Sequence, residues 1–143
     1  MLFETHWPVR VYYEDTDIYG IVYYANYLKY LERGRTEHMR RAGFDQNRVR
    51  AELELIFPVR KVDIDFLAPA VFDDELMVES RVVGISGARF EFLQQILRPQ
   101  NGNTDPDLIC RAQVIVACIN ATTFKPARLP EDIYTALETG NGS

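Results

Sequence analysis

One long stretch of the sequence, beginning at Asn26, has the periodicity of an amphipathic helix, and the rest of the chain has to pack around it. Apolar side chains recur there at helical spacing, while charged side chains fill the opposite side. Asn26 suits the N-cap and Gly43 the C′ position, which predicts a helix of about 16 residues. Gly34 in its middle costs about 1 kcal/mol relative to alanine, which indicates that another element packs closely there.

The remaining segments have the period of two that is typical of strands. Residues 7–14 alternate between apolar and polar side chains. After the helix, four further segments alternate or are almost wholly apolar, namely 56–67, 75–84, 88–97 and 108–120. No second long helix is predicted before the C-terminus, where a short helix from Pro130 precedes a frayed tail. One helix and five antiparallel strands predict an α+β fold in which the sheet wraps around the helix.

Length and composition suit one domain spanning residues 1–143, with a core over about residues 7–121 and a C-terminal tail over 122–143. The hydrophobic fraction of 47% is typical of a globular protein, and the net charge of −5 argues against a general nucleic-acid binder. No apolar run approaches the ~20 residues that span a bilayer, and no basic region followed by an apolar run opens the chain. We therefore expect a cytoplasmic protein.

The two cysteines indicate free thiols. Cys110 and Cys118 share one predicted strand and would lie about 26 Å apart, too far for a disulfide. Neither has the spacing of a zinc site, and the chain has 2 histidines. The sequence therefore predicts buried, reduced cysteines and neither a metal nor another cofactor.

The stretch between the first strand and the long helix is the candidate site. Residues 13–30 read YEDTDIYGIVYYANYLKY and gather three acids, a glycine and several tyrosines. Each of these residues also has an ordinary structural interpretation. Asp17 could cap a turn and Asn26 the helix, while Asp15 and Glu14 are more typical of structural or solvent-facing acids. The tyrosines suit a core or an interface, and His38 suits a packing position on the apolar face of the helix.

Residues 11–39, VYYEDTDIYGIVYYANYLKYLERGRTEHM, resemble the hotdog-fold acyl-CoA thioesterases. The similarity is greatest to the branch of 4-hydroxybenzoyl-CoA thioesterase and to bacterial thioesterases associated with the Tol–Pal gene cluster. It rests on the D-x-D of Asp15 and Asp17, on Gly20, on the helix entry IVYYANYL and on the E-R-x-R-T-E of residues 32–37. Residues 62–76, VDIDFLAPAVFDDEL, resemble a later strand and turn of the family.

The resemblance implies a role for individual residues. The family's catalytic carboxylate falls on Asp17, and its oxyanion donor, a backbone N–H, falls on Tyr24. Many Tol–Pal-associated members have histidine where this chain has Tyr24, whereas the 4-hydroxybenzoyl branch has tyrosine. Candidate substrate contacts near the turn are Gly20, Tyr23, Asn26 and Tyr27. Candidate contacts to the phosphates of coenzyme A are Arg60, Lys61, Arg89, Lys125 and Arg128, although each of them also suits an ordinary solvated surface charge.

The resemblance also implies partners. The substrate would be an acyl-CoA, the protein would form a homodimer or homotetramer, and an acyl carrier protein is a further expected partner. Apolar residues on both faces of several predicted strands exceed what one helix can cover, which independently favours an oligomer.

Thioester hydrolysis is chemically compatible with these residues. The chain has no GxSxG motif and no cysteine close to a histidine in sequence, so a carboxylate is the better candidate to activate water or to attack directly. Asp17 precedes Tyr24 by seven residues across the turn at Gly20, and free N–H groups at a helix start can polarise a thioester oxygen. The sequence therefore predicts an acyl-CoA thioesterase. The alternative is a non-catalytic acyl-thioester or acyl-carrier-protein binding module on the same fold.

Overall fold

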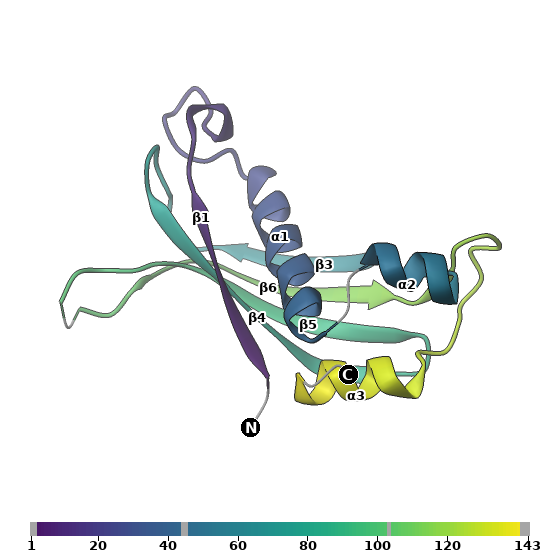
Figure 1. The fold of residues 1–143 in the computed structure, drawn as a ribbon. Helices are drawn as coiled ribbons and strands as arrows, with labels where there is room; N and C mark the ends of the chain where they lie inside the picture. The colour runs from purple at the N-terminus through teal and green to yellow at the C-terminus, as the bar shows by residue number, and fades with distance from the viewer. Residues whose placement is uncertain (1–2, 44–45, 103, 141–143) are drawn as a thin grey trace.

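A computed structural model of the chain describes residues 3–43, 46–102 and 104–140. Five strands form one antiparallel sheet in the order β1-β4-β5-β6-β3 (Figure 1). Their bounds are β1 Glu4–Arg10, β3 Val59–Phe66, β4 Glu75–Ser86, β5 Arg89–Arg98 and β6 Asp107–Ala117. Two very short strands, β2 Leu55–Ile56 and β7 Ile119–Asn120, pair separately. The predicted α+β hotdog fold, with a five-stranded antiparallel sheet, is confirmed.

The long helix α1, Asn26–Arg41, lies across one face of the sheet and contacts β1, β4 and β5 (Figure 1). It buries an apolar stripe of side chains against the strands, because residues three and four apart share one side of a helix. The close approach expected at Gly34 is confirmed. A Cβ atom at this position would lie 2.5 Å from Cγ1 of Val78 on β4, so only glycine lets the helix come this near.

The first strand ends earlier than the alternating pattern predicts. β1 stops at Arg10, and the chain turns through a short 3-10 helix, η1 Tyr13–Asp15, in which Tyr13 is 75% exposed. The reason is local: the Oδ2 atom of Asp15 accepts a hydrogen bond from the N–H of Tyr12 at 2.8 Å. Such a side-chain bond offers the backbone an alternative to the strand ladder.

Asn26 is not the N-cap that the sequence suggests. Ala25 occupies that position, and Asn26 is the first residue of α1. Its side-chain Nδ2 donates a hydrogen bond of 2.9 Å to the carbonyl oxygen of Asp15, so the amide ties the preceding loop to the helix instead of capping the helix itself.

Two shorter helices complete the described chain. α2, Gln46–Leu53, was missed in the sequence because it buries only Val49 and therefore lacks an apolar stripe. α3, Glu131–Thr139, begins after Pro130 as predicted and places Ile133 and Leu137 in the core. No helix of the described residues is long and apolar enough to cross a membrane.

Both cysteines are buried and free, as the sequence predicts. Burial raises the pKa of the Cys110 thiol to about 12 and that of the Cys118 thiol to about 11. Thiols of this kind are protonated and unreactive at neutral pH, so they fill space in the core.

Candidate active site

The loop that precedes α1 is closed on itself by backbone hydrogen bonds. The N–H of Asp17 donates to the carbonyl of Ile21 at 2.9 Å, and the N–H of Gly20 donates to the carbonyl of Asp17 at 3.0 Å. Gly20 has a φ of 79°, in the left-handed region that favours glycine. These bonds make a tight turn with Asp17 at its base.

The carboxyl group of Asp17 is half-buried and held by one oxygen. Its Oδ1 accepts a hydrogen bond of 2.8 Å from the N–H of Tyr19, which is the geometry of an Asx turn. Within residues 3–43, 46–102 and 104–140, no donor is bonded to Oδ2. The turn therefore orients the carboxylate and leaves one oxygen able to accept a proton or to attack an electrophile.

The start of α1 has backbone donors without acceptors. The first helical bonds run from the N–H of Asn26 to the carbonyl of Tyr23 and from the N–H of Tyr27 to the carbonyl of Tyr24. In the described part of the chain, no group accepts a hydrogen bond from the N–H of Tyr24 or Ala25. Unpaired N–H groups at the positive end of a helix dipole can stabilise a developing oxyanion.

Asp15, the other acid of the D-x-D, is engaged in holding the loop. Besides the bond from Tyr12, its carbonyl oxygen accepts hydrogen bonds from the N–H of Tyr23 at 2.8 Å and from the side chain of Asn26. Asp15 therefore ties the loop to both the end of β1 and the start of α1. The two acids of the motif therefore differ. The Asp15 carboxylate accepts the Tyr12 bond that shapes the loop, whereas the Asp17 carboxylate keeps Oδ2 without a donor among the described residues.

Aromatic side chains surround the helix start. The rings of Tyr23 and Tyr24 lie 4.9 Å apart, and Tyr24, which is 60% exposed, meets the edge of Phe66 at 5.8 Å. The neighbouring Tyr24 phenol raises the pKa of Tyr23, with a smaller contribution from the Asp17 carboxylate. Tyr27 is buried, and its hydroxyl oxygen accepts a hydrogen bond from the N–H of Ala70 at 3.2 Å. Tyr23 and Tyr24 thus present open surface beside the turn, whereas Tyr27 packs the loop.

Four of the candidate phosphate contacts, Arg60, Lys61, Arg89 and Arg128, lie at one end of the sheet, away from the Asp17 turn of the same protomer. Arg60 and Lys61 are exposed at the start of β3, whereas Tyr24 packs on Phe66 at its end. Arg89 is the first residue of β5. Arg128 lies at the same end of the sheet, because the N–H of the next residue, Leu129, donates a hydrogen bond of 3.2 Å to the carbonyl of Gly87 just before β5. The structure therefore gathers the basic residues at the end of the sheet opposite the turn.

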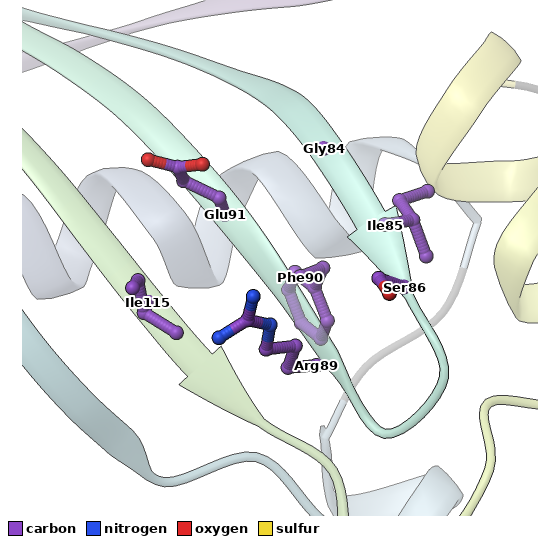
Figure 2. A pocket seen from close by; sticks show the side chains of 7 residues that line it. All are labelled: Gly84, Ile85, Ser86, Arg89, Phe90, Glu91 and Ile115. Carbon is purple, nitrogen blue, oxygen red and sulfur yellow. The ribbon is translucent and has the colours of Figure 1, made fainter.

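Arg89 also lines a shallow hollow of about 190 Å³ where β4, β5 and β6 meet. Figure 2 shows Arg89 and Glu91 on β5 beside Ile115 of β6. Gly84 lies opposite on β4, next to an irregularity in the β4–β5 register. The carboxylate of Glu91 in the same hollow reduces the local positive charge, so Arg89 alone is a weak anion site.

A five-stranded antiparallel sheet packed around one long helix is the arrangement of the hotdog fold. Comparison with known families agrees: residues 11–137 match the model described as the thioesterase-like superfamily, and the chain belongs to that family. The predicted enzyme class, a thioester hydrolase, is thereby confirmed.

Individual relatives are similar over nearly the whole chain. The acyl-CoA thioester hydrolase YbgC of Escherichia coli is 40% identical over 132 residues, which are 92% of this chain and 94% of that protein. The acyl-CoA thioesterase YbgC of Haemophilus influenzae is 42% identical over 130 residues, 91% of each chain. Among solved structures, a probable thioesterase from Bartonella henselae has a TM-score of 0.81 and 37% identity, covering 90% of this chain and 100% of that one.

Proposed function

We propose that this protein hydrolyses acyl-CoA thioesters to a free acid and coenzyme A, with Asp17 as base or nucleophile and the N–H of Tyr24 as oxyanion donor. The observation that carries the proposal is the pairing of a free carboxylate oxygen with a free N–H at the two ends of one hydrogen-bonded loop. The relatives from E. coli and H. influenzae, whose names give acyl-CoA as their substrate, support the substrate class.

Two routes use the same carboxylate. In the first, Asp17 takes a proton from water, the water oxygen bonds to the thioester carbon, and the C–S bond breaks as coenzyme A leaves as a thiolate, which is then protonated. In the second, an Asp17 oxygen bonds to that carbon and expels the thiolate, and water then hydrolyses the resulting mixed anhydride. Both routes pass through an oxyanion, so both depend on the helix start.

We further propose that the active form is at least a homodimer joined through β3. The sheet has two edge strands, β1 and β3. β1 contains Pro8, which has no N–H and hinders pairing along that edge, whereas β3 contains no proline. The apolar side chain of Phe66 on β3 is 47% exposed, and Leu67 beyond it is also exposed. These features support β3 as the joined edge.

A dimer of this kind explains the position of the basic residues. Two copies of one edge related by a two-fold axis pair antiparallel, so the start of β3 from one copy lies near the end of β3 in the other. Arg60 and Lys61 at the start of the strand would then approach the turn of the second copy and its bound coenzyme A phosphates. Light scattering at micromolar concentration is expected to give at least twice the chain mass of 16.5 kDa, or four times for a tetramer. A lone monomer contradicts the proposal.

The finer assignments follow from the resemblance. We propose short or medium acyl chains as substrates, membership of the 4-hydroxybenzoyl or Tol–Pal-associated branch, and acyl carrier protein as a further partner. Free buried thiols support a reducing compartment such as the cytoplasm.

A panel of acyl-CoA substrates with detection of the released thiol tests the function. Wild-type protein should release coenzyme A from at least one of them, and Asp17→Asn should lose that activity while remaining folded. A wild-type protein that binds acyl-CoA but releases no thiol would favour the alternative, a non-catalytic binding module. Full activity in Asp17→Asn would reject the carboxylate mechanism.

A further inference from the structure

Three side chains that could bind a metal meet on the face of the sheet opposite α1, and the proposed hydrolysis uses none of them. They are Glu4 and His6 of β1 and Glu79 of β4. Their ligand atoms all lie within 4.8 Å of one another, and Nε2 of His6 is 3.1 Å from Oε2 of Glu79. The spacing of residues in the sequence predicts no such cluster, because Glu79 lies 73 positions after His6.

Strand pairing alone creates this arrangement. Glu4 and His6 are two residues apart and therefore point to the same face of β1. His6 stands opposite Glu79 on β4, and Glu79 stands opposite Gln95 on β5. An imidazole, a carboxylate and an amide thus form a row across three hydrogen-bonded strands, with Glu4 beside it. The backbone ladder holds the row in place without any ion, so an ion would find the ligands already positioned.

The charge around the cluster also favours a cation. Glu4 and Glu79 place two carboxylates close together, and Arg81 lines the same hollow of about 180 Å³. Within the described ranges, however, Arg81 forms no ion pair with either carboxylate, and the side-chain contact at the cluster is the one between Nε2 of His6 and Oε2 of Glu79. Like charges at this distance repel each other, and a divalent cation would relieve that repulsion. The hollow is several times the ~30 Å³ share of one water molecule, which leaves room for water ligands.

We propose that Glu4, His6 and Glu79 bind one divalent transition-metal ion, with Zn²⁺ the best match. Imidazole nitrogen and carboxylate oxygen together suit zinc and its neighbours, whereas Ca²⁺ and Mg²⁺ prefer oxygen ligands alone. Three protein ligands leave a coordination position for water or for the amide oxygen of Gln95. This proposal departs from the sequence-based prediction of no metal, which rested on the spacing of possible ligands along the chain.

The ion acts as a clamp on an edge strand and takes no part in the chemistry. Thr5 lies between the two β1 ligands and points to the inner face of the sheet. Its Oγ1 atom is 2.7 Å from Nδ1 of His38 on α1. An ion that joins β1 to β4 at this point therefore also holds the strand where it meets the helix. The Asp17 turn lies beyond the other end of β1. We expect the metal to raise stability and to leave kcat unchanged.

Calorimetric titration of chelator-treated protein with Zn²⁺ at about pH 7.5 tests the proposal. We expect one site per chain with a Kd of ~10 µM or tighter, because three converging ligands bind far better than one surface histidine. His6→Gln and Glu79→Gln should each weaken binding by at least ~10-fold, since each removes one of only three ligands. Glu75→Gln, which changes an exposed acid on the same strand, is the matched control and should bind as the wild type does.

Thermal unfolding and activity give independent readouts. Zn²⁺ at ~100 µM should raise Tm by about 3–6 °C in the wild type and in Glu75→Gln, but not in the two ligand variants. Mg²⁺ at the same concentration should have no effect, and chelators should lower Tm without lowering kcat. A Kd weaker than ~10 µM, several ions per chain, or binding that changes less than ~10-fold in either ligand variant would overturn the proposed site.

Discussion

Just before α1 begins, the N–H of Tyr24 has no acceptor among the described residues, whereas about three turns into the helix His38 is completely buried. The half-buried carboxyl of Asp17 lies in the loop that leads to this helix start. His38 lies between the rings of Phe3 and Phe92, with centroids at 4.6 and 5.3 Å. Burial lowers the pKa of His38 to about 4, so the imidazole is neutral at pH 7. Asp17 is accessible and suits catalysis, whereas His38 is buried and serves packing.

This difference teaches that residue type alone does not identify a catalytic group. Histidine is the commonest general base in enzymes, but a base must reach its substrate. His38 is sealed by aromatic rings and bonded to Thr5, while Asp17 keeps one oxygen free. The four predictions that follow test the comparison, beginning with the largest expected effect.

Removing the charge of Asp17 should have the largest effect of the four changes, and the effect should fall on kcat. Asp17→Asn keeps the shape of the side chain, and kcat is expected to fall by ~10²–10⁴-fold with little change in KM, as for the loss of a positioned general base. Asp15→Asn should cost much less, because Asp15 orders the loop and an amide oxygen can still accept the Tyr12 bond. Steady-state kinetics of both variants decide the matter: equal losses would mean that Asp17 is the wrong acid or that both merely hold the turn.

The buried His38 should make stability depend on pH. In the unfolded chain a histidine has a pKa near 6.5, but in the folded protein its pKa is about 4. Between these values the unfolded state binds the extra proton, so the contribution of neutral His38 is full above about pH 6.5 and is lost as the pH falls toward 4. The free energy of unfolding should decrease by up to about 3 kcal/mol over this range.

Denaturant unfolding at several pH values checks this expectation. His38→Gln should flatten the pH dependence, whatever its own stability at pH 7. His6→Gln is the matched control, because it removes the other histidine of the chain, which is exposed, and keeps His38. The pH dependence that His38 causes should therefore remain. If the free energy of unfolding of His38→Gln depends on pH as steeply as that of the wild type, carboxyl groups rather than His38 cause the loss of stability in acid.

The middle of α1 should tolerate no added methyl group. A Cβ at Gly34 would clash with Val78, so Gly34→Ala should destabilise the protein by about 1–3 kcal/mol although alanine favours helices. Gly84→Ala is the control, because the nearest atom to its new Cβ lies 3.8 Å away, an ordinary contact. Denaturant midpoints measure both. A more stable Gly34→Ala would mean that the helix can move away from β4 without loss.

The smallest effect is expected at the Tyr24 phenol. If the oxyanion donor is the main-chain N–H, Tyr24→Phe keeps the donor and should change kcat by no more than about threefold. The exposed ring also makes few core contacts, so Tm should hardly change. A loss of kcat as large as that of Asp17→Asn would assign the chemistry to the phenol hydroxyl instead.

Features that depend on near neighbours in the chain could be predicted well. The long helix, the five strands and the close contact at Gly34 follow from periodicity and from the properties of glycine. Errors arose where a local side-chain bond competed with that periodicity. Asp15 ends β1 at Arg10 by bonding Tyr12, and Asn26 reaches back to Asp15 instead of capping the helix. α2 was missed because eight mostly polar residues with one buried Val49 resemble a loop.

By itself, the sequence determined which segments form the long helix and the strands, and the turn in which Asp17 precedes an open helix start, because periodicity and turn bonds depend on residues a few positions apart. Only the tertiary structure decided that Arg60, Lys61, Arg89 and Arg128 share the end of the sheet opposite Asp17. It alone brought Glu79 to His6 and Thr5 to His38. The physical reason is that strand order and register come from pairing across long stretches of chain, which local periodicity does not specify.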